Sequence, residues 1–400
     1  MDDKAYVTAL KSEPIPSELA FPREEYEARL QRLYAEMDAR KLDALILADP
    51  GNLFYTTGYY TFETSLHGCA LLPRKGAPVI QVASLEVGVA VLKTWIDDVV
   101  GYDWSKSGDI VQQLVGFIKD RKLSTKRIGI EALLTGFRIQ HLRDLEAALP
   151  RARFVDASDI LYKARIVKSP AEIDCHRKAA DYTWAGIQAG LAAIQPGKTD
   201  NDVAAASYAA MVRAGSEFMS IQPIVSSGHR HGWAHTHFLR VPLKMGDTVF
   251  LEFGGVHKRY CSPMMRTAII GKPNDQVRRV ADALKESVER IIGAARPGRT
   301  CHEVAVEAKK GLAKVETEAF HSGVYGYTVG AQFPPSWVEG SAFFAEGDET
   351  VLKPGMVFHL PTCFRVPNRF GVGLSETLLV TDGACEALTR KDRDLHMVAV

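Results

Sequence analysis

The stretch GDTVFLEFG, residues 246–254, opens with a glycine turn and continues as an apolar strand that carries one carboxylate, Glu252. A similar stretch, GMVFHLP, occupies residues 355–361. Upstream of each lies a Pro-Gly turn, then a threonine and, three residues later, an acidic residue: Thr199 with Asp202, and Thr300 with Glu303. This spacing is typical of a capping box that begins a helix. The second part of the chain therefore contains two similar halves, each with a helix followed by strands.

Two halves of this kind commonly pack about a pseudo-two-fold axis, with a site where their two curved sheets face each other. Glu252 is the candidate residue for such a site. Burying a carboxylate in the otherwise apolar strand 248–253 is costly unless the charge has a partner. A plain structural role on the strand is the alternative, and we favour the functional one.

The first part of the chain alternates between helical and strand-like patterns. Apolar residues at helical spacing from residue 22 to 40 predict a helix, and the run ALIL at 44–47 predicts a short buried strand. Further strand-like segments occur at 69–72, 79–82 and 127–131, and a helical segment at 85–92. The pattern predicts an α/β domain over residues 1–160 and a second, α+β domain over residues 161–400, which opens with a long amphipathic helix at 170–191.

Composition argues against several classes of function. The 400 residues carry a formal net charge of +1, which supplies no basic stripe for a nucleic acid. The apolar stretches fall far short of the roughly 20 residues that span a bilayer, and the N-terminus lacks the pattern of a secretory signal. The six cysteines show no CxxC spacing, which is typical of free thiols in a reducing compartment. We expect a cytoplasmic protein that acts on a small molecule, without nucleic-acid or membrane partners.

Four histidines alternate shortly before the strand that carries Glu252: His229, His231, His235 and His237. Alternating histidines on a strand share one face and can bind zinc. The alternative is a polar loop that enters the site with one catalytic member. We favour catalysis at His235, because a histidine side chain exchanges protons near neutral pH, and keep the metal site as the second hypothesis.

Resemblance to a known family rests on motifs spread along the chain. They are the strand at 246–255, RYCS at 259–262, RT at 266–267, GYTVG at 326–330, VLKPGMVF at 351–358 and GLSETLLVT at 373–381. Together they resemble the family that contains methionine aminopeptidase, prolidase and creatinase, over essentially the whole chain. The resemblance implies an N-terminal creatinase-like α/β domain and a C-terminal pita-bread domain with an internal pseudo-two-fold repeat.

Peptidase members of this family hold two divalent metals through two Asp, one His and two Glu. At the matching positions this chain has Glu252, Pro263, Tyr327, Pro361 and Ser375. A dinuclear site for hard metals needs several oxygen and imidazole ligands, and proline has no side-chain donor. We therefore expect neither a metal nor another cofactor at this site.

Creatinase is the metal-free branch of this family, and its catalytic histidine precedes its hairpin residue by the interval that separates His235 from Glu252. A closer resemblance, to the ectoine hydrolase branch, lies in EFGG at 252–255, KRY at 258–260 and FPPSW at 333–337. In that branch the glutamate at the position of Glu252 acts on the ring carbon of a cyclic amidine. A carboxylate suits this reaction, because it pairs with an amidinium cation and can add to its electrophilic carbon. The resemblance implies catalytic roles for His235, Glu252 and Tyr327.

Residues that contact the substrate also follow from the resemblance. In the N-terminal domain, Phe62, Glu63 and His67 fall where creatinase presents ligand-contacting residues to the site of a neighbouring subunit. A site completed in this way implies a homodimer. The remaining residues expected to contact the substrate are His231, Tyr260, Trp337 and Glu376.

The predicted function is metal-independent hydrolysis of a C–N bond in a small cyclic amidine or guanidino compound, ectoine or a relative of it. The alternatives are a creatinase-like amidinohydrolase, an Xaa-Pro aminopeptidase-like protein and a catalytically dead binding homologue. The replaced ligands argue against a peptidase. The joint presence of His235 and Glu252 argues against a dead homologue.

Overall fold

The computed structural model describes residues 1–12, 16–106, 108–134, 136–389 and 392–399. The chain divides into two compact units, Met1–Arg165 and Ile166–Val400. The predicted boundary, between residues 160 and 161, falls within the helix Ser158–Arg165 that ends the first unit. The mixed α/β architecture predicted from the sequence is confirmed in both units.

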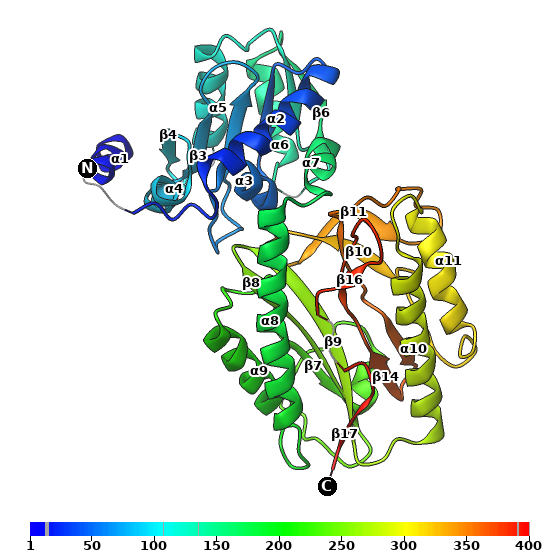
Figure 1. The fold of residues 1–400 in the computed structure, drawn as a ribbon. Coiled ribbons are helices and arrows are strands. Elements are labelled where there is room, and N and C mark those ends of the chain that lie inside the picture. Colours follow the sequence, from blue (N-terminus) through cyan, green and yellow to red (C-terminus); the bar gives the residue numbers. More distant parts are fainter. Residues whose placement is uncertain (13–15, 107, 135, 390–391, 400) are drawn as a thin grey trace. The chain divides into compact units, whose positions relative to one another are not determined.

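A six-stranded mixed sheet forms the centre of the N-terminal unit (Figure 1). Its strand order is β4-β3-β2-β1-β5-β6, in which β1 pairs antiparallel with β2 and parallel with β5. The strands are β1 (Ala44–Leu47), β2 (Cys69–Pro73), β3 (Val79–Ala83), β4 (Asp98–Tyr102), β5 (Arg127–Ile130) and β6 (Arg153–Asp156). The strand predicted at 44–47 therefore forms as expected and lies inside the sheet.

Helices cover both faces of this sheet, which explains why β1 is apolar throughout. Leu45 and Leu47 pack in one hydrophobic cluster with α2, α3, α4 and α7, whereas Ala44 and Ile46 pack in the opposite cluster with α5 and α6. Alternate side chains of a strand point to opposite faces, so a strand covered on both sides is apolar at every position. The helices are α1 (Asp3–Lys11), α2 (Arg23–Ala39), α3 (Pro50–Thr57), α4 (Val87–Lys93), α5 (Gly108–Asp120), α6 (Ile139–Ala148) and α7 (Ser158–Arg165).

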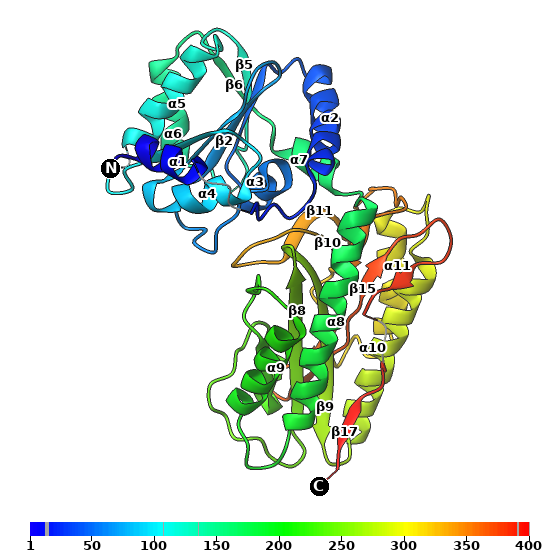
Figure 2. The ribbon, with the colours of Figure 1, turned by 60° about the vertical axis from the view of Figure 1, so that its left-hand side comes forward.

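The C-terminal unit consists of two halves in sequence, each with a pair of helices followed by strands (Figure 2). The first half contains α8 (Pro170–Ala193), α9 (Asp200–Ala214), β7 (Ile224–Ser227), β8 (Thr248–His257) and β9 (Tyr260–Ile270). The second contains α10 (Asp275–Ala294), α11 (Cys301–Leu312), β10 (Gly326–Val329), β11 (Val338–Phe344), β12 (Val357–His359), β13 (Cys363–Val366), β14 (Phe370–Gly373), β15 (Thr377–Leu379), β16 (Glu386–Ala387) and β17 (His396–Val398). Within the described ranges, none of the helices has the length and apolarity needed to cross a membrane.

Each half provides most of one sheet, and β17, from the end of the chain, joins the sheet of the first half. One has the order β17-β9-β8-β7, the other β11-β10-β12-β15-β16, and β13 and β14 form a separate hairpin. The helices α8 and α9 pack on the first sheet through Ile187, Met211, Leu251 and other residues of one hydrophobic cluster. The helices α10 and α11 belong to the second half and pack in a second cluster with the strands of that same half. The two cores are thus built in the same way.

The internal repeat predicted from the two Pro-Gly turns is visible in the local geometry. Thr199 and Thr300 each accept a hydrogen bond from the backbone of the acidic residue three positions on, and that residue's carboxylate accepts one in return. Both predicted capping boxes are therefore confirmed. In each turn the glycine, Gly197 or Gly298, has a positive φ, of 82° and 87°, which favours glycine over every other residue.

Hydrogen bonds between β9 and the segment 373–377 join the two halves, and we call this contact the β9 seam. Met265 donates its backbone N–H to Ser375 Oγ at 2.6 Å, and Ser375 returns a backbone hydrogen bond to Met265 at 3.2 Å. Thr267 Oγ1 donates to the carbonyl of Gly373 at 3.0 Å and accepts from its N–H at 2.8 Å. All four residues are buried, so the seam holds the sheets together without competition from water.

Candidate active site

A cavity of about 590 Å³ lies in the C-terminal unit and takes its walls from both halves. This volume is in the range typical of small-molecule sites. The first half contributes Ile221, Ile224, Ser226, His231, residues 233–237, Phe250, Glu252 and Met265. The second half contributes Phe320, Ser322, Val324, Tyr327, residues 335–338, Pro361 and Arg365. The predicted site between the two sheets is therefore present as a cavity.

Glu252 reaches this cavity because of the alternation along β8. Phe250 and Glu252 face the cavity, whereas Leu251 and Phe253 point into the core beneath α8. Within the described part of the chain, the Glu252 carboxylate accepts no hydrogen bond from protein. Burial raises its pKa to about 7, and the positive charge of Arg365 offsets part of this rise. The carboxylate thus titrates near neutral pH and is free to act on a ligand.

The histidine segment is a short 3-10 turn, Gly228–Gly232, followed by a loop rather than a strand. His231 is buried and stacks on Phe250 at a centroid distance of 4.2 Å, and burial holds its pKa well below the usual value. His235 and His237 are exposed on the loop and line the cavity with His231. His235 has a φ of 56°, a left-handed conformation that is uncommon outside glycine. The segment is a turn and a loop, so the four histidines do not share one face of a strand, and a catalytic role for His235 stays a prediction.

Tyr327 lines the cavity and belongs to a chain of hydrogen bonds that leads away from it into the protein. It faces His359 across the antiparallel pair of β10 and β12. Trp337 Nε1 donates to the Tyr327 hydroxyl at 2.8 Å, and His359 Nδ1 lies 2.9 Å from the same oxygen. His359 Nε2 in turn lies 2.8 Å from Ser375 Oγ. The chain therefore runs from the cavity wall to the β9 seam.

The buried hydroxyl of Ser375 determines the direction of these hydrogen bonds. Its oxygen accepts the N–H of Met265, and the nearest acceptor for its own proton is His359 Nε2. His359 is neutral, because burial lowers its pKa to about 3, so its single ring proton then sits on Nδ1 and is donated to Tyr327. With Trp337 and His359 both donating to its oxygen, Tyr327 must point its own O–H elsewhere. The arrangement leaves that proton available to a ligand in the cavity.

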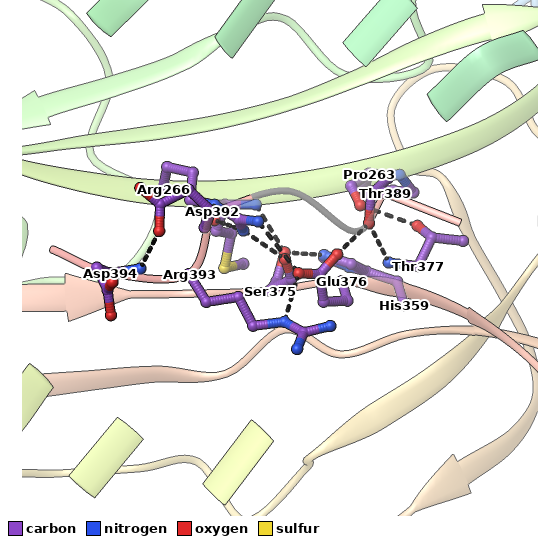
Figure 3. A network of polar contacts seen from close by, with 11 residues as sticks. Pro263, Arg266, His359, Ser375, Glu376, Thr377, Thr389, Asp392, Arg393 and Asp394 are labelled. Atoms are coloured by element: carbon purple, nitrogen blue, oxygen red, sulfur yellow. Dashed lines mark hydrogen bonds and ion pairs between the residues drawn. The ribbon is translucent and has the colours of Figure 1, made fainter. Parts of the chain in front are cut away.

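Two residues predicted to contact the substrate, Glu376 and Tyr260, do not line the cavity. Figure 3 shows the Glu376 carboxylate between Arg266, at 3.1 Å, and Arg393, at 2.9 Å, with a further hydrogen bond from Thr389. Tyr260 donates its hydroxyl to Glu172 at 2.6 Å and is buried. Both polar groups are satisfied inside the protein, so their positions do not support the predicted substrate contacts.

The three residues predicted from the N-terminal unit differ in exposure. Phe62 is 73% exposed, and Glu63 is half-buried and accepts a hydrogen bond from the Ser65 hydroxyl. His67 is buried, with its ring edge-on to His141 at 5.1 Å, and burial lowers its pKa to about 3. His67 therefore stays neutral near pH 7. The role of these residues in a second subunit stays a prediction.

Arg365 and His359 belong to the site although the sequence analysis did not select them. Arg365 lines the cavity from β13, and His359 orients Tyr327 from β12. His359 lies in the stretch 355–361 and is the polar residue in an otherwise apolar strand, as Glu252 is in β8. That interruption was the available signal for His359. Arg365 lies in the short strand CFRV and carries no such signal.

The residues at the five metal-ligand positions do not fit a two-metal centre. Pro263 and Pro361 offer no side-chain donor, and the hydroxyl of Ser375 is engaged by Met265 and His359. In the described ranges, no group of three or more His, Cys, Asp or Glu side chains is placed to share a metal ion. Glu252 is the single carboxylate among these five positions.

Comparison with known proteins places this geometry in a family. Residues 174–382 match the Metallopeptidase family M24, and residues 29–167 match the Creatinase/Prolidase N-terminal domain. The chain is 29% identical to an ectoine hydrolase of Halomonas elongata, over 95% of this chain and 98% of the relative. It is 31% identical to an uncharacterised hydrolase/peptidase of Sinorhizobium fredii, over 94% of this chain and 98% of the relative.

Among solved structures, the prolidase of Pyrococcus horikoshii superposes with a TM-score of 0.80 at 25% identity, and the match covers 92% of this chain and 99% of that one. The similarity spans both units and includes the two-half unit that encloses the cavity. The chain therefore belongs to the Metallopeptidase family M24, a family of hydrolases, with a creatinase/prolidase N-terminal domain and a C-terminal domain of the pita-bread fold.

Proposed function

We propose that the protein is a metal-independent hydrolase that opens a C–N bond in a small cyclic amidine or guanidino compound, with ectoine as the first substrate to test. The observation that carries this proposal is the desolvated carboxylate of Glu252, which faces a cavity where the described residues provide no group of three metal-binding side chains. Similarity to an ectoine hydrolase supports the substrate class. Similarity to a prolidase makes peptide hydrolysis the competing function.

In the proposed reaction, the amidinium cation of the substrate pairs with Glu252. The carboxylate then adds to the electrophilic carbon between the two nitrogens, or takes a proton from a water molecule that adds there. The oriented O–H of Tyr327 donates a hydrogen bond to the group that gains electron density. His235 passes a proton to the nitrogen that leaves when the C–N bond breaks. Addition of one water and cleavage of one bond open the ring and leave an amide and an amine.

We also propose that the enzyme is a cytoplasmic homodimer. An active site completed by a second subunit accounts for a large aromatic residue, Phe62, that is 73% exposed on the N-terminal unit. Covering this side chain at a subunit contact would remove its apolar surface from water.

The first prediction tests the reaction class. Purified protein, treated exhaustively with chelator and checked for metals by mass spectrometry, should open the ring of ectoine at a rate within about twofold of the untreated enzyme, because no step depends on a metal. Creatine and an Xaa-Pro dipeptide serve as the competing substrates. Turnover of the dipeptide that is lost on chelation and restored by Mn, Co or Zn would establish a metallopeptidase instead.

The second prediction concerns the two groups assigned to catalysis. The substitution His235→Ala should lower kcat about 10²–10⁴-fold, the usual contribution of a general acid. Glu252→Gln keeps the shape but removes the charge, and it should cost more. Because both groups act in one transition state, the double variant should be little worse than Glu252→Gln. His229→Ala, an exposed histidine of the same segment outside the cavity lining, is the matched control. Rates within about threefold of wild type for both single variants would remove this pair from the mechanism.

The third prediction is a pH dependence from Glu252. The other charged or titratable groups that line the cavity with Glu252 are the positive Arg365, the neutral His231, Tyr327 and the loop histidines His235 and His237. Since its pKa in the free enzyme is raised to about 7, kcat/KM should rise with pH through a midpoint near 7 as the reactive carboxylate forms. A bound amidinium stabilises the carboxylate, so the corresponding limb of kcat should lie at lower pH.

The same raised pKa has a consequence for folding. The protonated form of Glu252 is favoured in the folded state, so its contribution to the free energy of unfolding is present at low pH and is lost as pH rises from 4.5 through about 7. Glu252→Gln should flatten the pH dependence of the free energy of unfolding in this window.

The kinetic prediction for Glu252 has its own test. A kcat/KM profile without a limb near neutral pH, or a limb that persists in the residual activity of Glu252→Gln, would contradict the assignment of that limb to Glu252.

The fourth prediction concerns assembly. Light scattering of the purified protein should give twice the mass of the chain, and Phe62→Ala should raise KM or weaken the dimer. Ile139→Ala, which removes another exposed apolar side chain of the same unit, is the control. A fully active monomer would show that the site needs no second subunit.

A further inference from the structure

Arg365 is a cation in the cavity wall that forms no ion pair with any described residue. It lines the cavity from β13, and two backbone hydrogen bonds with Phe320, of 2.7 and 3.0 Å, fix its position. Its Nε atom is buried and has no hydrogen-bond partner. Within the described part of the chain, no carboxylate oxygen lies within 4.0 Å of its guanidinium group.

Two buried arginines of this unit direct their terminal guanidinium nitrogens to acceptors in the protein. Arg266 donates to the carbonyls of Met265 and Ser375 and pairs with Glu376. Arg259 donates to the carbonyls of Phe218 and Gln332. A buried donor without a partner is costly, and a charged one more so. Arg365 differs from these two arginines because its half-buried guanidinium group lines the cavity and donates no hydrogen bond to the described part of the chain, which leaves its donors available to a ligand.

The cavity thus contains two side chains of opposite charge that do not neutralise each other. Glu252 and Arg365 interact over a distance, since Arg365 lowers the pKa of the carboxylate, but they form no ion pair. The nearby His231 is kept neutral by burial and by Arg365 itself. A ligand with a positive group at one end and a negative group at the other would satisfy both side chains in a single orientation.

We propose that Arg365 binds a carboxylate of the substrate, so that the substrate is a zwitterion with its amidinium at Glu252 and its carboxylate at Arg365. This inference rests on the proposed function for the identity of the cationic group. A guanidinium presents two parallel N–H donors that match the two oxygens of a carboxylate. The pairing positions the ring, because a substrate turned end to end would place like charges together at both residues.

The experiment compares two ligands that differ by one group: ectoine, whose ring carries a carboxylate, and its decarboxylated analogue, the same ring without it. Binding is measured by calorimetry in the Glu252→Gln background, so that turnover does not consume the ligand. Into this background are placed Arg365→Gln, Arg365→Lys and, as the matched control on the exposed turn of the same hairpin, Arg369→Gln.

Arg365→Gln should weaken the binding of ectoine about 10- to 100-fold, the usual effect of losing charge-assisted hydrogen bonds, and change that of the analogue less than about threefold. Arg365→Lys keeps the charge but loses the two-pronged geometry, so its effect should be intermediate. Arg369→Gln should change neither. Equal weakening of both ligands by Arg365→Gln, equal binding of both ligands before the substitution, or no binding of either would overturn the inference.

Turnover by the enzyme with Glu252 intact separates this inference from the proposed function. Carboxylate-selective binding that depends on Arg365, without ring opening, would support the binding role and refute the hydrolase. Ring opening of both ligands with equal kcat/KM would support the hydrolase and refute the binding role.

Discussion

The β9 seam is the contact on which the site depends. Its hydrogen bonds hold the sheet that carries Glu252 against the half that carries Tyr327 and Arg365, and they are buried from water. One seam residue, Ser375, also starts the hydrogen-bond chain that orients Tyr327. Ser375 therefore helps to set both the position of the two walls and the direction of the Tyr327 hydroxyl proton.

This double use shows how the two walls of the cavity are held in place without a metal ligand at position 375. The resemblance to the peptidases implies a metal-binding glutamate at that position. A serine is small and neutral, and here it satisfies a backbone N–H and a histidine nitrogen. In the proposed function, desolvation of Glu252 takes over the activation that a metal provides in those relatives, since it keeps the carboxylate reactive near neutral pH.

Local patterns in the sequence were sufficient to predict what depends on local physics. The strand at 44–47, the capping boxes and the exceptional position of Glu252 all follow from periodicity, spacing and the cost of burying charge. The cost of burying a charge predicts that a buried carboxylate needs a partner, but it does not reveal which residue that partner is. Glu252 and Glu376 are both buried carboxylates, yet Glu376 is neutralised by Arg266 and Arg393. Arg365 was missed for the converse reason, because a single arginine in a strand has no distinctive spacing.

Because the cavity takes one wall from each half, ligand binding should change the thermal stability of the C-terminal unit. A ligand in contact with both walls adds contacts across the β9 seam, and unfolding of this unit must break them. Binding to the folded state alone stabilises it by an amount that grows with ligand concentration relative to the dissociation constant. The melting temperature then ranks compounds without any knowledge of the reaction. Thermal-shift screening of nitrogen-containing metabolites is thus a direct route to the natural substrate.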